Sequence, residues 1–119
     1  MTSIFLAGQG ILQAESSIDY PRADRLVTGK PQRITQNLYK SGPLSCGIWQ
    51  CEVGAWNIQF AADQQEFFCV IEGVVRIHDA KTQSYIEVRA GQSGIIPASF
   101  IGKFEVLEAV KKYYVLSTV

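Results

Sequence analysis

Few side chains in this chain are of the types that carry out catalysis or bind metal ions. The 119 residues include one histidine, His78, and three cysteines, Cys46, Cys51 and Cys69. The cysteines form no CxxC pair, and Cys46 and Cys51 are five residues apart, so within one strand their thiols would point to opposite faces. We therefore expect three buried, reduced thiols rather than a metal or redox site.

Glu66 is the acidic residue best placed to do chemistry, because it begins an otherwise apolar run, Glu66–Ile71. A carboxyl group that faces a barrel interior could act as a general acid or base, or could anchor a ligand. Burial disfavours the charged carboxylate unless an arginine, a lysine or several hydrogen-bond donors contact it. The other interpretation is a structural glutamate, hydrogen-bonded to the backbone or to a tyrosine. The sequence leaves both open.

The remaining charged candidates look like surface residues. His78 lies next to a loop and shares a strand face with Arg76, so we expect it to be exposed. Lys103, Lys111 and Lys112 alternate with apolar residues, which is typical of a solvated sheet edge.

Alternating apolar and polar residues predict the strands that would position Glu66. The segment before it has one apolar face, expected to point inward, that consists of Trp56, Ile58, Phe60 and Ala62. After a polar corner at Asp63–Gln65, the run Glu66–Ile71 is apolar on both faces except for Glu66 itself, as in a strand that is covered on both sides. Gly73 is expected to end this strand.

From Cys46 onward, short strands recur at regular intervals, which indicates an all-β sandwich or barrel. In Tyr85–Arg89 the inward residues are expected to be Ile86 and Val88. In a later strand one face carries Phe100, Gly102, Phe104 and Val106, so position 102 should point into the barrel.

Residues 1–31 differ from the rest of the chain, because Pro21, Pro31 and several glycines interrupt any long period. We interpret them as an N-terminal arm on a single barrel domain of residues 32–119. Within or beside the arm, Ile18–Leu26 could form a short helix or turn, and Gln32–Tyr39 an edge strand.

Composition excludes several classes of protein. Apolar residues make up 47% and charged residues 18%, with 11 basic and 11 acidic side chains, which indicates neither disorder nor a nucleic-acid-binding surface. No apolar run approaches the ~20 residues of a membrane helix, and Met1–Leu12 lacks the features of a signal peptide. We expect a cytoplasmic protein without membrane or nucleic-acid partners.

The glycine spacing resembles that of the cupin superfamily. Gly54, Glu66 and Gly73 match its first motif, and Gly91 and Pro97 match its second, with Ser99 at the second glycine of that motif. GIWQCEVG, EFFCVIEG and FIGKFEVLEAVKKYYVL are similar to the small single-domain cupins grouped with ureidoglycine aminohydrolase-like and ethanolamine-utilisation cupins. Over roughly residues 32–117 the resemblance implies an RmlC-like jelly roll, an antiparallel β-barrel of two sheets. It also implies a homodimer in which the arm lies on the partner.

The resemblance does not extend to the metal ligands. The two histidines of the first motif fall on Phe60 and Ala62, its glutamate on Glu66, and the histidine of the second motif on Gly102. One carboxylate cannot hold a transition metal against water. We therefore expect no bound metal and no other cofactor.

Two functional hypotheses remain. In the first, the barrel binds a small-molecule metabolite with Glu66 as polar anchor, and the other ligand-binding residues are Trp56, Phe60, Ala62, Phe68, Gly102 and Phe104. Trp49 and Phe100 could join them or belong to the core. In the second, the protein is an enzyme on small nitrogen-containing metabolites, of aminohydrolase or lyase type, with Glu66 as general acid or base. We favour binding, because the usual electrophile of this fold, the metal, has no ligands here.

Overall fold

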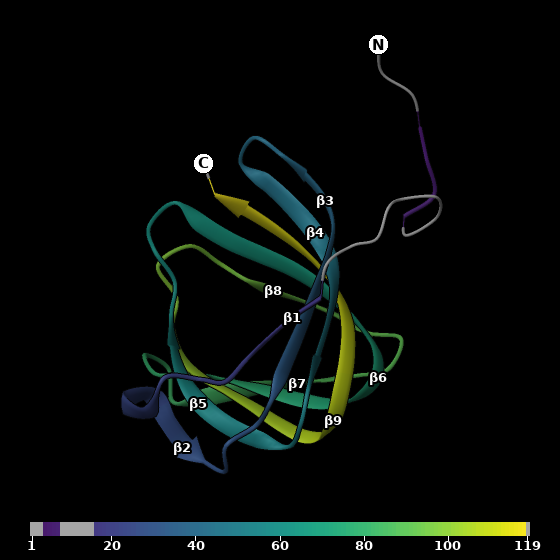
Figure 1. Cartoon of the computed structure of the whole chain (residues 1–119). Coiled ribbons are helices and arrows are strands. Elements are labelled where there is room, and N and C mark those ends of the chain that lie inside the picture. The colour runs from purple at the N-terminus through teal and green to yellow at the C-terminus, as the bar shows by residue number, and fades with distance from the viewer. Residues whose placement is uncertain (1–3, 8–15, 119) are drawn as a thin grey trace.

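The computed structural model describes residues 4–7 and 16–118, and within them the chain is almost entirely β-structure (Figure 1). The elements are β1 Ser16–Asp19, the 3-10 helix η1 Ala23–Arg25, β2 Leu26–Thr28, β3 Arg33–Ser41, β4 Leu44–Cys51, β5 Gly54–Gln59, β6 Gln64–Asp79, β7 Ser84–Arg89, β8 Ser93–Ile96 and β9 Ile101–Thr118. None of the helical structure described here is long or apolar enough to cross a membrane. The predicted all-β fold is confirmed.

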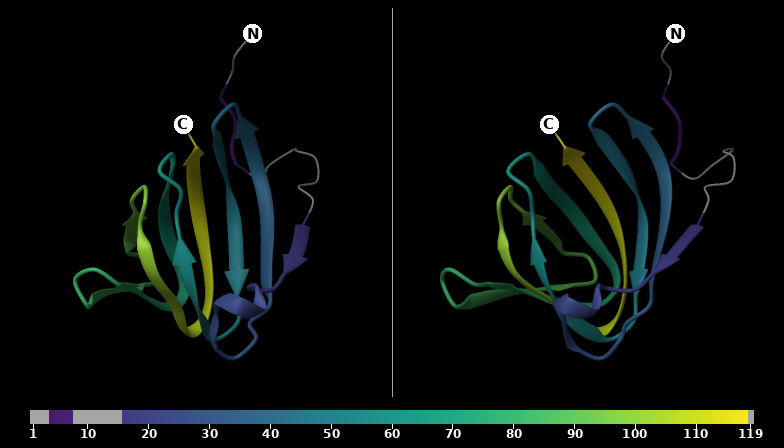
Figure 2. Two further views of the ribbon diagram at one scale, coloured as in Figure 1. Left: turned by 90° about the vertical axis from the view of Figure 1, so that its left-hand side faces the viewer. Right: turned by 60° about the vertical axis from the view of Figure 1, so that its left-hand side comes forward.

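The long strand β9 lies at the centre of the sheet. Its first half runs antiparallel between β5 and β6, with Phe104 opposite both Trp56 and Ile77. Its second half runs between β4 and β6, with Val110 opposite Cys51. β8 and β7 pair with the two ends of β6. The result is one antiparallel sheet that curls around a common interior (Figure 2).

Gly73 bends β6 instead of ending it. The strand continues to Asp79, but its register against β9 shifts three times between Val70 and Val75. Gly73 has a φ of +91°, in the left-handed region that favours glycine. Through this bend one strand serves both halves of the jelly-roll fold, so the two halves are connected as one curled sheet.

Inward-facing side chains form the core, as the alternation predicts. Its buried members are Cys51, Trp56, Phe68, Val70, Val75, Ile77, Val88, Ile96, Phe104, Val106 and Val110. Burial raises the pKa of the Cys51 thiol to about 12. Cys46 and Cys69 are also free but only half-buried, so the prediction of three buried thiols holds for Cys51 alone.

Two segments are more exposed than the alternation predicts. Ile86, expected inward, is 51% exposed, because the β6–β7 hairpin projects beyond the curled sheet (Figure 2). The run Glu66–Ile71 was expected to be covered on both faces, but Phe67 on its outer face is 46% exposed while Phe68 is fully buried.

The described part of the N-terminal arm joins the barrel sheet. β1 pairs with β3, and β2 pairs with β5. β3 therefore lies between β1 and β4 and is not an edge strand over Arg33–Gln36. Ile18–Leu26 contains the end of β1 and the short η1 helix. Pro31 is fully buried against Gly54, which fixes the arm to the start of β5.

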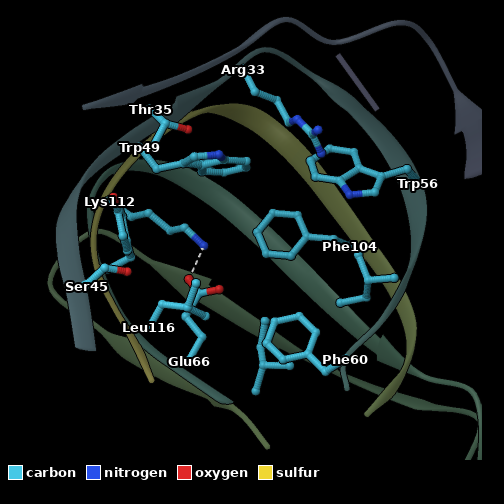
Figure 3. Close-up of a pocket in the computed structure, with 13 residues that line it drawn as sticks. Arg33, Thr35, Ser45, Trp49, Trp56, Phe60, Glu66, Phe104, Lys112 and Leu116 are labelled. Atoms are coloured by element: carbon cyan, nitrogen blue, oxygen red, sulfur yellow. Dashed lines mark hydrogen bonds and ion pairs between the residues drawn. The ribbon is translucent and has the colours of Figure 1, made fainter. Parts of the chain in front are cut away.

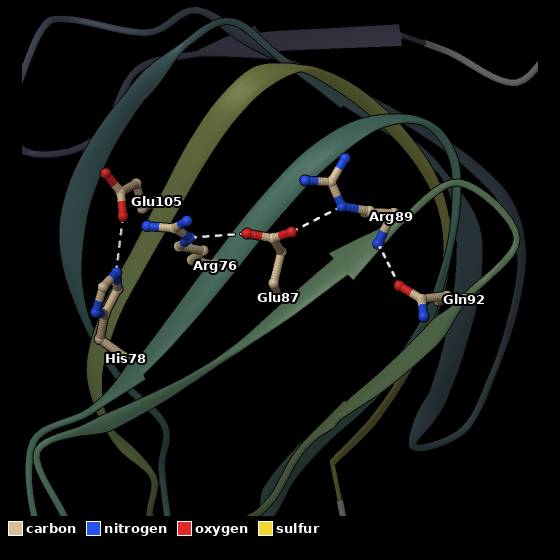
Figure 4. A network of polar contacts seen from close by, with 6 residues as sticks. All are labelled: Arg76, His78, Glu87, Arg89, Gln92 and Glu105. Carbon is tan, nitrogen blue, oxygen red and sulfur yellow. Dashed lines mark hydrogen bonds and ion pairs between the residues drawn. The ribbon is translucent and has the colours of Figure 1, made fainter.

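A polar network covers the outer face of β6, β7 and β9 (Figure 4). Glu87 accepts hydrogen bonds from Arg76 at 2.9 Å and Arg89 at 2.7 Å, and these bonds lower the pKa of its carboxyl group. His78 lies 2.7 Å from Glu105, with 27% of its side chain exposed. The histidine is thus on the outside of the sheet as predicted, although it is half-buried rather than fully exposed.

The bend at Gly73 provides a test of the fold. A Cβ at this position would overlap the carbonyl oxygen of Ala109 and lie 2.7 Å from that of Glu108. Gly73→Ala should therefore lower the free energy of unfolding by about 3 kcal/mol or more, as measured by urea denaturation, from backbone strain plus the clash. Gly91 is the matched control, because its φ is +88° but a Cβ there meets nothing within 4 Å. Gly91→Ala should cost only about 1 kcal/mol, and an equal loss in both variants would contradict a crowded bend.

Candidate functional site

The curled sheet encloses a cavity of about 330 Å³, which lies within the range of small-molecule sites (Figure 3). Its walls come from β3, β4, β5, β6, β8 and β9 and from the turn after β5. The lining residues are Arg33, Thr35, Ser45, Trp49, Trp56, Ile58, Phe60, Glu66, Ile96, Phe104, Lys112, Tyr114 and Leu116. Aromatic rings dominate one side, and most of the polar groups lie on the other.

An ion pair between Glu66 and Lys112 lies inside this cavity. Both residues have the inward parity of their strands, β6 and β9. Lys112 is opposite Val70 in the ladder, and its side chain reaches along β6 past Phe68 to Glu66. Its Nζ donates to Glu66 Oε2 at 2.7 Å, and the two side chains are 5% and 13% exposed.

Three aromatic rings surround the ammonium group of Lys112. Its Nζ lies 4.4 Å from the ring centroid of Phe68, 4.5 Å from that of Trp49 and 5.0 Å from that of Phe104. Cation–π attraction at these distances offsets part of the hydration that the ammonium loses. The rings and Glu66 together hold the charged amine in an otherwise apolar environment.

Lys112 was predicted to belong to a solvated edge, and that prediction is wrong. The residue is 4% exposed, whereas Lys103 and Lys111 are half-buried. The signal was present in the sequence, because Lys112 shares the parity of Phe104 and Val110, which face inward on the same strand. Lysine, however, rarely lies in a core without a specific partner.

Within the part of the chain that the structure describes, Glu66 uses one of its two carboxylate oxygens. Among the described residues its sole hydrogen-bond donor is Lys112, which contacts Oε2. The other oxygen points into the cavity (Figure 3). The ammonium likewise has three N–H groups and donates one of them to a described residue. The ion pair therefore presents both an acceptor and donors to whatever enters the cavity.

Two other polar side chains of the lining, Arg33 and Tyr114, have hydrogen-bond partners outside the cavity. Arg33 lies 5.3 Å from the ring of Trp56, and it donates to Asp19 through Nε at 2.9 Å and Nη2 at 2.7 Å. The hydroxyl of Tyr114 donates to Asn37 Oδ1 at 3.0 Å, and burial raises the pKa of Tyr114. The positive charges at the cavity each have a carboxylate partner.

Four residues predicted to bind ligand line the cavity: Trp56, Phe60, Glu66 and Phe104. Phe68 is fully buried beneath Lys112 and is not part of the lining. The other two residues predicted to bind ligand, Ala62 and Gly102, do not line the cavity.

Ala62 lies in the exposed turn between β5 and β6, because β5 ends at Gln59 and the alternation stops there. Gly102 lies in β9 between Ile58 of β5 and Asp79 of β6. A Cβ at this position would overlap the carbonyl oxygen of His78. A histidine at position 102 would therefore not fit this backbone. In the described part of the chain, no three His, Cys, Asp or Glu residues are grouped as metal ligands, and the absence of a metal stays a prediction.

The ion pair can be tested by a double-mutant cycle. Lys112→Met should lower the free energy of unfolding at pH 7 by about 3–5 kcal/mol, because it leaves a carboxylate unpaired among aromatic rings. Adding Glu66→Gln should restore part of that loss, so the two changes are not additive. Lys111→Met, which alters the neighbouring half-buried lysine, should change stability by less than about 1 kcal/mol. Additive losses in the double variant would show that the two residues are not coupled.

Comparisons with known proteins agree on the fold. The structure of a DUF861-family protein of unknown function from Pseudomonas syringae pv. tomato matches with a TM-score of 0.76 and 20% identity, over 90% of this chain and 45% of that one. This chain thus spans less than half the length of the Pseudomonas protein. The EutQ protein of Clostridium difficile matches with a TM-score of 0.66 and 22% identity, over 84% and 80% of the two chains. A putative ethanolamine utilization protein Q from Salmonella typhimurium gives 0.65 and 14%, over 89% and 98%.

At these identities the structural likenesses show the fold alone, and no curated protein matches the sequence. The family is shown by the sequence itself, since the model of the EutQ-like cupin domain matches residues 38–114 of the 119. This match confirms the resemblance to ethanolamine-utilisation cupins. The chain belongs to the EutQ-like cupin domain family.

Proposed function

We propose that the protein binds a small-molecule metabolite in the barrel cavity, with Glu66 and Lys112 together as the polar anchor. The observation that carries this proposal is the carboxylate oxygen of Glu66 to which no described residue donates a hydrogen bond and which points into an aromatic cavity of about 330 Å³. Apolar walls with a few convergent polar groups are the usual composition of a ligand pocket.

Energetics support a role in recognition for the ion pair. A buried ion pair is weak evidence for stability, because desolvation of both charges can exceed their attraction, and apolar side chains of similar volume often serve the fold equally well. The pair of Glu66 and Lys112 has unused hydrogen-bonding capacity directed at open space, where a ligand could complete it.

The contact between Glu66 and Lys112 favours a ligand-binding role for Glu66 over a role in acid–base catalysis. A general acid or base needs a proton that it can exchange with its substrate at the working pH. Glu66 Oε2 already accepts a hydrogen bond from Lys112 at 2.7 Å, and the ammonium group is itself held by three rings, so the geometry is that of an anchoring ion pair. The enzyme hypothesis, an aminohydrolase or lyase that uses Glu66, is the alternative outcome of the experiment below.

Both tryptophans of the chain, Trp49 and Trp56, line the cavity, so intrinsic fluorescence reports directly on its contents. Screening a library of small metabolites should reveal at least one compound that changes this fluorescence saturably. Ser45→Phe places a ring inside the cavity and should abolish that binding. Gln50→Phe places the same ring on the outer face of β4 and should preserve it.

Each hit should also be incubated with the protein and followed by NMR for several hours, so that any chemical conversion of the compound is detected. An unchanged compound supports binding, whereas conversion that is lost in Glu66→Gln would favour the enzyme. Binding that survives Ser45→Phe would contradict the cavity as the site.

We also propose a homodimer, formed through the outer face of β8, β6, β9, β4 and β3. Cross-strand neighbours continue an uncharged row across these five strands: Ile95, Phe67, Val115, Cys46 and Tyr39. Four of the five are between 37% and 66% exposed. The adjacent row adds Tyr113, which is 50% exposed, and Ile48.

A second copy of the chain fits this face better than a charged partner. Strands about 4.8 Å apart give the two rows an area of a few hundred Å², a size at which an exposed apolar patch is often functional. Polar residues border it on both sides, with Glu72 and Lys111 on one and Gln65 and Ser117 on the other. An apolar centre with a polar rim is the anatomy of a protein interface. Two-fold pairing would bury identical patches without burying an unpaired charge.

Two isoleucines of similar exposure test the dimer. Ile95 lies on the proposed face and is 66% exposed, and Ile101 lies off it and is 56% exposed. Sedimentation should give the wild type and Ile101→Glu a mass near twice 13.2 kDa. Ile95→Glu should shift the equilibrium to monomer, because it buries a charge at the interface. A monomeric wild type would refute the dimer, and an unchanged Ile95→Glu dimer would refute this face.

A further inference from the structure

We infer that the cavity selects an uncharged, flat ring compound that carries a cyclic amide, with its N–H and C=O on one edge. This inference rests on the proposed function, because it names the class of ligand that the same cavity would bind. Three features lead to it: the charge balance of the lining, the hydrogen bonds left open by the ion pair, and the arrangement of the rings.

Charge balance argues for an uncharged ligand. Within the described residues, the charged groups of the lining pair off, Lys112 with Glu66 and Arg33 with Asp19 at the rim. A ligand carboxylate or phosphate would bring a negative charge that meets only compensated cations. A ligand ammonium would likewise meet only a compensated carboxylate. Burying an unpaired charge in an apolar cavity is costly, so ions should be rejected.

The open hydrogen bonds define the edge of the ligand. Glu66 offers a carboxylate oxygen that can only accept, and Lys112 offers N–H groups that can only donate. A ligand that completes both needs a donor and an acceptor side by side. In an open-chain secondary amide the trans geometry directs N–H and C=O to opposite sides. A ring holds the amide cis, and both groups then lie on the same edge.

The rings define the body of the ligand. Trp56 and Phe104 are stacked, with their centroids 5.3 Å apart and their planes 28° apart, and Trp49 meets Phe104 edge-on at 83°. Planar ligands gain most from contact with such rings, because offset stacking matches the aromatic quadrupoles. The ion pair adjoins these rings, since Lys112 Nζ contacts Trp49 and Phe104, and the second carboxylate oxygen of Glu66 points into the cavity next to them (Figure 3). A planar cyclic amide would therefore stack and hydrogen-bond at once.

Four small probes test the inference by tryptophan fluorescence. Thymine is a flat cyclic amide, 1,3-dimethylthymine has the same ring without N–H donors, and benzoate and benzylammonium are flat ions. Thymine should bind at least ten times more tightly than each of the other three. N-methylation leaves the buried carboxylate oxygen without a donor, and each of the two ions brings a charge that meets only compensated groups. Equal affinity for 1,3-dimethylthymine, or tighter binding of either ion, would overturn the class.

Glu66→Gln provides the matched variant. It keeps the side-chain shape but removes the negative charge, so Lys112 becomes an uncompensated cation. Thymine should lose at least tenfold in affinity, and benzoate should gain at least tenfold over its affinity for the wild type. If benzoate does not gain in folded Glu66→Gln, the charge-balance argument is wrong.

The wild-type comparison stands even if that variant does not fold. If none of the probes binds while the metabolite screen yields ligands, the amide class is overturned and the binding function stands. If no compound of either set binds, the binding function fails as well.

Discussion

The contact between Glu66 Oε2 and Lys112 Nζ constrains much of this barrel. Two opposite charges lie inside a sheet whose buried core is made of apolar side chains, and neither charge is tolerable there alone. The rings of Phe68, Trp49 and Phe104 compensate the ammonium from three sides. Glu66 keeps one oxygen directed at the cavity. The same ion pair therefore accounts for the aromatic surroundings of Lys112 and for a polar group exposed in the cavity.

That ion pair depends on how two long strands run together. β9 and β6 are paired along nearly their whole lengths, and the pairing places Lys112 opposite Val70, within reach of Glu66. The bend at Gly73 lets β6 follow β9 around the curl instead of leaving it. A strand that ended at Gly73 would leave the second half of the barrel without this partner. Backbone geometry at one glycine thus supports the part of the sheet that closes beneath the cavity.

The chain retains the glycine positions of the first cupin motif but not the histidines of either motif. Gly54 and Gly73 both serve close approaches of the backbone, to Pro31 and to Ala109. Ser99, at a motif glycine position, adopts a φ of +65°, the conformation that a glycine would take without strain. By contrast, the positions of the motif histidines carry Phe60, Ala62 and Gly102, none of which can ligate a metal. In this chain the polar centre of the barrel is an organic ion pair, and the lysine comes from the last strand, outside both motifs.

Local patterns in the sequence were enough to predict the fold class and most of one cavity wall. Alternation with a period of two is a local property, so it correctly directed Trp56, Glu66 and Phe104 inward, and glycine spacing gave the family. Tertiary structure decided the rest. Ala62 lies outside the cavity because β5 ends at Gln59, three residues earlier than the alternation predicts, and position 102 cannot project into the cavity because a Cβ there would overlap the carbonyl oxygen of His78 on β6. Lys112 has the inward parity, but its position in the cavity depends on a carboxylate 46 residues away in the chain. A lysine considered without a partner is predicted to be solvent-exposed, because burying its charge is costly. The paired register of β6 and β9 brings the carboxylate of Glu66 to 2.7 Å from Lys112 Nζ.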